Sequence, residues 1–478
     1  MVSAIFTYSN QGYRFFGMLC ALLITTRLYV VILKNWRRGI YALLIYLPFA
    51  GLPTILLYPA PRITLLIKDL LFVIPAYLGF ILWWHSRNRH NRPVLFPNRA
   101  TIPLALLVGL LFVQFFNPNL INPLVGLIGL KVWLFYVPLF FLAYHFVDSK
   151  EELFKVLKVL FFLGLLPVLV GIIQAVFVYS GYSELAYRIY GPAAAAVTQN
   201  FATLGIDCVN GKNCNAWLVR TPSIFTFVAQ YWLFLLTMYP LGYAIWMKAN
   251  QQKNRFSQLY LALLGLVIVA ACSSGSRAAL VLTPFYFLLV AIISGKLQDF
   301  WKPIFLLAGG FVVMAMLLGI STNILISYTI EVLAFYLGRE GMMSELFRAL
   351  DTTLLGAGVG MSTGPARYAF NASDAVTQFG ALESFYAKTI VELGVLGLII
   401  VVILLGVLLW NGYRCVICLK DPILRHLGVA LLALLLVSVI YLAKGAMIDY
   451  DPLNVYFWLY AGILMKLPKL EIKVEVER

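Results

Sequence analysis

Charged residues are scarce in this chain. Only 12% of its 478 residues are Asp, Glu, Lys or Arg, whereas 62% are hydrophobic. Soluble domains carry about 25% charged residues, so this composition excludes a water-soluble globular protein. The formal net charge is nevertheless +16. Because the basic residues are spread over many loops and form no single patch, this charge does not indicate binding to nucleic acid.

Nucleotide-binding motifs are absent. The chain contains no Walker loop, no GxGxxG before a helix and no internal repeat. These absences exclude ATP or a dinucleotide as the expected source of energy. We expect no cofactor and no resident metal.

Histidine and cysteine are also rare, with four and six copies. Every histidine falls on the side of the membrane that we predict to be cytoplasmic, so proton transfer on the other side would need a carboxylate, a tyrosine or a lysine. Cys208 and Cys214 share one predicted outward loop, where a disulfide and two free thiols are equally compatible with the sequence. Cys415 and Cys418 form a lone CxxC, which is a weak signal for zinc or redox chemistry.

Long apolar runs dominate the rest of the sequence. Several approach the roughly 20 residues needed to cross a hydrocarbon core, and they do not alternate as the strands of a barrel would. The sequence therefore predicts an all-α polytopic transmembrane bundle of about 12–13 spans. The predicted spans are 13–34, 38–58, 68–85, 101–117, 123–147, 153–178, 222–247, 257–273, 277–295, 303–324, 384–410, 426–443 and 453–466.

Lysine and arginine predict the orientation of these spans, because short loops rich in both stay in the cytoplasm. Alternate loops carry the excess, which places two long loops and the short SSGSR turn on the outward side. Five regions follow from this topology. They are the N-terminal helices (1–178), a first large periplasmic loop (179–221), the central helices with the Ser-Arg turn (222–324), a second large periplasmic loop (325–383), and the C-terminal helices with a short cytoplasmic tail (384–478).

Polar groups on the outward side are the candidate functional residues. Arg220 lies where the first long loop re-enters the membrane, and it is either a ligand for an anion or an arginine that snorkels to the interface. Arg277 follows Ser276 in a turn of small residues that begins a helix, and helix N-termini attract anions. This combination favours a phosphate site, with a plain small-residue turn as the alternative.

The second long loop contains GAGVG, whose Gly358 and Gly360 are candidate substrate-binding residues, and ESFYAKTIVELGVLG begins at its end. Glu383 stands at the start of the next helix, where the helix dipole favours a carboxylate. Glu392 lies nine residues further on, at a depth that is costly unless the carboxylate is paired or hydrated. Lys388, four residues earlier, is a candidate partner for it, although a lysine that precedes the glutamate is the less favourable order.

A pair of aspartates, Asp449 and Asp451, lies in the outward IDYDP turn. Their oxygens could hold Mg²⁺ or Mn²⁺. Capping of the turn before Pro452 is the alternative that we favour.

These motifs resemble the bacterial O-antigen polymerase and O-antigen ligase superfamily, which are membrane glycosyltransferases of the GT-C type. The resemblance extends from LLIKDLLF (65–72) to the twelfth span. The matching positions are Arg220, Ser276 with Arg277, GAGVG, and ESFY followed by Glu392, Gly394 and Gly397. Ligase-like members have histidine where this chain has Glu383, followed by Ser384, so the chain looks more like the polymerases.

The resemblance implies transfer of a glycan from a polyprenyl-diphosphate carrier to a hydroxyl of an acceptor glycan, at the periplasmic leaflet of the bacterial inner membrane. Arg220 and Arg277 would hold the diphosphate, and Glu383 would accept the proton of the acceptor. Tyr386 and Arg339 would contact sugar or phosphate. A chain-length regulator and a flippase are the partners that the resemblance implies, besides the lipid bilayer.

Two alternatives remain. A ligase would attach glycan to a lipid or protein acceptor, and the identity of the acceptor would discriminate it. A flippase for a lipid-linked oligosaccharide would need charged groups near the bilayer midplane and symmetry between halves. Arg27 and Lys131 are basic residues well inside predicted spans, but they form no stripe, and we find no such symmetry.

Overall fold

Within the residues that it describes, the computed structural model consists mainly of helices, with one short two-stranded ribbon. It describes residues 22–57, 64, 66–86, 100–188, 190–191, 204–207, 213–218, 221–295, 301–306, 308–309, 344–364, 366 and 382–476. The chain divides into two compact units, residues 1–95 and 96–478.

The first unit contains helices at the first three predicted spans: the span 68–85 agrees with the helical stretch Asp69–His85, whereas the span 38–58 is divided into shorter helices. Residues 22–34 are helical. The elements that follow are α2 (Trp36–Tyr46), η1 (Leu47–Phe49), α3 (Leu52–Leu56), the π-helical η3 (Asp69–Val73) and α4 (Ile74–His85). Pro48 and Pro53 lie where the predicted span 38–58 divides into separate helices, because proline cannot donate a backbone hydrogen bond within a helix.

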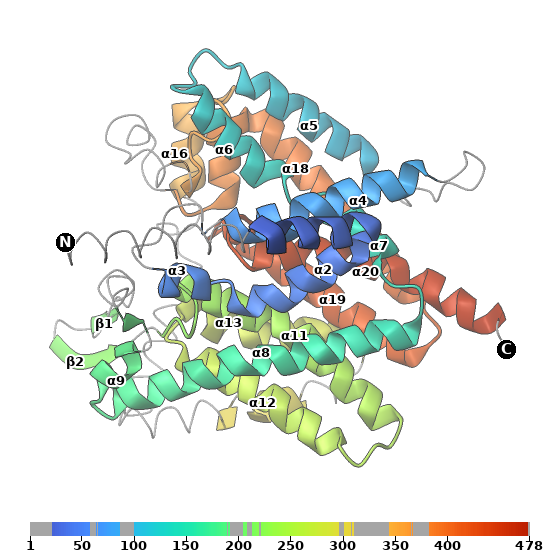
Figure 1. Ribbon diagram of the computed structural model, residues 1–478. Helices are drawn as coiled ribbons and strands as arrows, with labels where there is room; N and C mark the ends of the chain where they lie inside the picture. The colour runs from blue at the N-terminus through green and yellow to red at the C-terminus, as the bar shows by residue number, and fades with distance from the viewer. Residues whose placement is uncertain are drawn as a thin grey trace, which may run out of the picture. The chain divides into compact units, whose positions relative to one another are not determined.

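The second unit contains most of the predicted spans (Figure 1). Its helices before the central region are α5 (Thr101–Phe115), α6 (Pro123–Leu134), α7 (Leu139–Phe146), α8 (Lys150–Tyr179) and α9 (Ser183–Arg188). Its later helices are α11 (Val228–Gln251), α12 (Ser257–Ser273), α13 (Arg277–Ser294), α16 (Ser344–Thr352), α18 (Phe385–Cys418), α19 (Pro422–Tyr441), the 3₁₀ turn η8 (Met447–Asp449) and α20 (Leu453–Val476). Residues 301–306 and 308–309, at the start of the predicted span 303–324, are also helical.

Among the described residues, four helical stretches are long and apolar enough to cross a membrane. They are Pro123–Phe146, Lys150–Val178, Phe385–Cys418 and Pro422–Tyr441, and four shorter apolar helices accompany them. The predicted helical membrane protein is thus confirmed in its class. The count of 12–13 spans stays a prediction.

The first long loop contains a feature that the sequence reasoning missed. Strands β1 (Leu204–Asp207) and β2 (Asn213–Leu218) pair antiparallel, so this loop is not wholly irregular and the fold is not strictly all-α. Cys208, one half of the disulfide left open above, lies outside the described residues, whereas Cys415 and Cys418 are free thiols.

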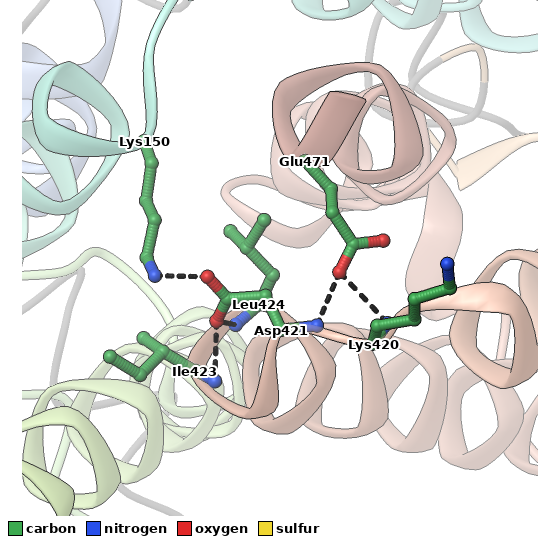
Figure 2. A network of polar contacts seen from close by, with 6 residues as sticks. All are labelled: Lys150, Lys420, Asp421, Ile423, Leu424 and Glu471. Atoms are coloured by element: carbon green, nitrogen blue, oxygen red, sulfur yellow. Dashed lines mark hydrogen bonds and ion pairs between the residues drawn. The ribbon is translucent and has the colours of Figure 1, made fainter. Parts of the chain in front are cut away.

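Contacts between the ends of the long helices of the second unit define two ends of the bundle. We call one the basic end: it holds the start of α8, the junction of α18 with α19 and the last part of α20. Lys150 at the start of α8 pairs with Asp421, whose backbone N–H donates to the Glu471 carboxylate of α20 (Figure 2). These contacts join three helices that lie far apart in the sequence.

Asp421 also caps α19, because its side chain accepts from the amides of Ile423 at 2.8 Å and Leu424 at 3.1 Å (Figure 2). Partial burial raises the pKa of Asp421, but the hydrogen bonds from Lys150 and from these amides together lower this pKa by more than burial raises it. The net pKa of this carboxyl lies below its ordinary value. The group is therefore charged at neutral pH and suited to hold both the lysine and the helix start.

The opposite end of the bundle, which we call the site end, holds the starts of α11 and α18 and the junctions α12–α13 and α19–α20. The amide of Thr221, ahead of α11, donates to the carbonyl of Ser274 at 3.2 Å. The ring of Trp232 in α11 lies 5.5 Å from that of Tyr441 at the end of α19. The amide of Phe385 donates to the carbonyl of Leu442 at 2.9 Å. The described parts of the Ser-Arg turn and of the segments before α11, before α18 and after α19 thus lie at one end of the bundle.

Candidate functional site

The Ser-Arg turn lies at the site end, between α12 and α13. Ser276 is the N-cap of α13, it is buried, and its amide donates to the Ser274 hydroxyl at 3.3 Å. In the described part of this turn, the Ser276 hydroxyl makes no cap to the first helix amides. Those amides form the positive end of the α13 dipole, which suits an anion. Arg277 is the first residue of α13, and its side chain lies outside the described residues.

The side chain of neither candidate arginine lies within the described residues. Arg220 lies outside the described residues, and so does Arg339. The residue after Arg220, Thr221, is fully buried and bonded to the Ser-Arg turn, so the structure brings the chain beside Arg220 to the start of α13. Their roles toward a diphosphate stay predictions.

Glu383 is the residue before the N-cap of α18. Its side chain is 67% exposed, and one carboxylate oxygen accepts from Lys444 at 2.7 Å. Ser384 is the N-cap and accepts from the Ala387 amide at 3.3 Å. A carboxylate that is both accessible and held by one partner is able to accept a proton from a bound hydroxyl.

Tyr386 lies one residue into α18, and its hydroxyl donates to the carbonyl of Val439 in α19 at 2.9 Å. The predicted sugar contact therefore has a structural competitor, because this hydroxyl already joins two helices. Its role toward a substrate stays a prediction.

The helix that carries these residues is broken. Gly394 has φ 74° and ψ −176°, which divides α18 into a first part (385–393) and a second part (395–418). The second part has 24 residues, which at 1.5 Å per residue is about 36 Å and is enough to cross a bilayer by itself. Glu392 therefore lies in the last turn of the first part of α18, whereas the sequence suggested one continuous helix.

The Gly-rich segment fills this break. The carbonyl of Leu354 accepts from the Val395 amide at 3.0 Å, and the Ala357 amide donates to the carbonyl of Val391 at 2.7 Å. A Cβ on Gly394 would lie 2.6 Å from the carbonyl oxygen of Leu354, so glycine is needed where the two backbones meet.

Gly358 and Gly360, which we predicted to contact substrate, are buried in this segment with φ of 111° and 90°. A Cβ on Gly360 would overlap the carbonyl of Val125 in α6. The Gln114 side chain of α5 donates to the carbonyl of Leu355 at 2.7 Å. These contacts assign the glycines a packing role, and binding to substrate stays a prediction.

Glu392 is fully buried and its carboxylate accepts three hydrogen bonds. The donors are the Trp133 indole at 2.7 Å, the Ser362 amide at 3.0 Å and the Thr363 hydroxyl at 2.8 Å. Three donors satisfy a charge that would otherwise be costly to bury. Glu392 therefore joins α6 and the Gly-rich segment to α18.

Lys388, the candidate partner for Glu392, instead pairs with Asp449 of η8. Nζ of Lys388 lies 2.5 Å from the Asp449 carboxylate, with both side chains buried, and 4.9 Å from the centroid of the Trp133 ring. The ion pair of Lys388 is thus made with Asp449, because α18 packs on the turn between α19 and α20, which brings this carboxylate to the lysine. Asp449 is thereby engaged by an ammonium group, which disfavours the metal interpretation of the IDYDP turn.

No group of three or more His, Cys, Asp or Glu that could hold a metal ion occurs within the described residues.

Replacing Glu392 with alanine is expected to destabilise the protein, because three buried donors lose their acceptor. Each buried donor left unsatisfied costs about 1–3 kcal/mol. Thermal unfolding of the detergent-solubilised protein would show a Tm several degrees below that of the wild type. Glu392→Gln keeps one acceptor oxygen, so its Tm should lie between those of the wild type and Glu392→Ala. Equal Tm values for all three proteins would contradict the stabilising role of the three hydrogen bonds to Glu392.

Two residues of the site were not predicted from the sequence. Lys444 follows α19 on the predicted outward side, where basic residues are depleted, so its position against the charge rule was a usable signal. Glu345 in α16 accepts from the amides of Glu383 at 3.0 Å and Ser384 at 2.8 Å. No local pattern indicated this contact, since it joins positions 38 and 39 residues apart.

Comparison of the chain with protein-family models and with curated proteins found no match.

Proposed function

We propose that this chain is a membrane glycosyltransferase that polymerises polyprenyl-diphosphate-linked oligosaccharide repeat units at the periplasmic face, making O-antigen, capsule or exopolysaccharide. One observation carries the proposal most: the start of α11, the Ser-Arg turn and Glu383 lie at the same end of the bundle. Thr221 bonds to Ser274, and Glu383 bonds to Lys444, three residues after the Tyr441 that packs on α11. An anion site and a proton acceptor at one end are the two requirements of the proposed reaction.

The basic end of the bundle supports the predicted orientation of the protein in the membrane. Lysines and arginines of the basic end lie over aromatic rings, as interfacial residues do. Lys248 lies 4.3 Å from the Phe154 centroid, and Arg255 lies 4.8 Å from that of Phe256. We propose that this end faces the cytoplasm of a bacterial inner membrane, which leaves the site end facing the periplasm.

The proposed chemistry is a displacement that inverts the anomeric carbon. The acceptor hydroxyl oxygen forms a bond to that carbon, the bond to the diphosphate breaks, and the hydroxyl proton passes to Glu383. Arg220 and Arg277 stabilise the charge on the departing polyprenyl diphosphate. Cleavage of the bond between the anomeric carbon and the diphosphate of the donor supplies the free energy.

The test is reconstitution of the purified protein in liposomes with undecaprenyl-diphosphate-linked repeat units. A ladder of products that differ by one repeat unit is the expected result. One shifted band on a different acceptor would replace polymerase by ligase. Repeat units that change leaflet without any new glycosidic bond would replace both by a flippase.

A further inference from the structure

The second long loop of the unit contains a segment, residues 344–363, that follows the first part of α18 from its start to its break. We call it the strap. Near its beginning, Leu346, Ala349 and Leu350 of α16 pack on apolar residues of α18 that include Ala387 and Ile390. The apolar face of α16 is thus covered by α18, which fixes the strap along the helix that carries Glu383.

The strap grips this helix at both ends. At the far end, the Glu392 carboxylate holds Ser362 and Thr363. At the near end the strap supplies the carboxylate and α18 supplies the donors: Glu345 accepts from the amides of Glu383 and Ser384. Both grips use carboxylate hydrogen bonds, which are stronger than those between neutral groups.

The near grip acts on the backbone from which Glu383 projects. One Glu345 oxygen accepts both amides, and the Glu383 side chain is held separately by Lys444. The peptide and the carboxylate of Glu383 are therefore fixed by two partners that come from different segments. Without Glu345, the amides of Glu383 and Ser384 would lose this acceptor, and the side-chain contact with Lys444 would remain.

We propose that Glu345 is a positioning residue for Glu383: it holds the backbone of Glu383 and Ser384 so that the carboxylate faces the acceptor hydroxyl. This inference rests on the proposed function. Because small displacements of a catalytic group can cost about 100-fold in rate, loss of this hold lowers turnover and leaves binding of the donor unchanged.

The test compares Glu345→Ala, Glu345→Gln and Asp351→Asn in the reconstituted polymerisation assay. Glu345→Ala is expected to lower kcat by about 10–100-fold, with KM for the lipid-linked donor unchanged. Glu345→Gln should restore most of kcat, since its amide oxygen can accept the same two N–H groups. Asp351→Asn removes the same charge from an exposed position of α16 and should behave as the wild type.

Hydrogen exchange supplies a readout that does not depend on activity. The amides of Glu383 and Ser384 should exchange faster in Glu345→Ala than in Glu345→Gln, with the rest of α18 unchanged. An unchanged kcat in Glu345→Ala, or no rescue by Glu345→Gln, would overturn the positioning role alone. A wild-type protein that transfers no glycan would overturn the proposed function and the positioning role together.

Discussion

Alanine in place of Arg277 is expected to abolish polymer formation while the protein remains in the membrane at the wild-type level. The proposed leaving group is a diphosphate with at least two negative charges, and Arg277 begins α13, whose dipole also favours an anion. A guanidinium presents several N–H donors to phosphate oxygens. Removal of one such donor from a preorganised site costs about 100–1,000-fold in rate. Polymer should therefore fall below detection on a gel.

Controls for this result use other arginines of the chain. Arg277→Lys keeps the charge but not the fork and should retain a small part of the activity. Arg188→Ala removes an exposed arginine of α9 and should leave the ladder unchanged. Arg220→Ala is expected to match Arg277→Ala. Normal-length polymer from both alanine variants would eliminate the diphosphate role of the two arginines.

Glutamine in place of Glu383 is expected to slow transfer by about 100–10,000-fold, the usual contribution of a general base. The substitution preserves size and leaves an oxygen that can still accept from Lys444, so the fold of the site end should persist. Binding of the lipid-linked donor should be unchanged, because the carboxylate acts on the acceptor. Single-turnover measurements with saturating donor separate the two steps.

A matched control for this variant is Glu151→Gln, which alters an exposed glutamate at the start of α8, at the basic end. Its turnover should equal that of the wild type. If Glu383→Gln also transfers glycan at the wild-type rate, another group accepts the proton and the role of Glu383 is refuted. A weaker apparent affinity for the donor, with kcat preserved, would place Glu383 at the sugar of the donor instead.

The two expected losses differ in what they leave intact. A protein without Arg277 should fail to bind donor tightly, whereas one without the Glu383 carboxylate should bind donor and fail to transfer it. Measurement of donor binding in both variants therefore distinguishes an anion site from a proton acceptor, even where both variants make no polymer.

The sequence by itself determined the helical class and most helix positions. The predicted span 257–273 coincides with α12, and the predicted 277–295 differs from α13 by one residue. These positions follow from local properties, namely the length of an apolar run and the small or polar residues that end it. The placement of Ser276 at a helix start and of Glu383 just before one follows from the same local signals.

Only the tertiary structure decided which distant groups meet. The pairing of Lys388 with Asp449 and that of Glu383 with Lys444 each join positions 61 residues apart, so they depend on how α18 packs against the turn after α19. The break at Gly394 likewise exists because the Gly-rich segment supplies backbone hydrogen bonds there. Such contacts depend on packing between separate elements, and no periodicity within a single helix encodes them. The contact of Glu345 with the start of α18 is the clearest case. The sequence around this acidic residue, in a predicted long loop, does not indicate which distant residue it contacts.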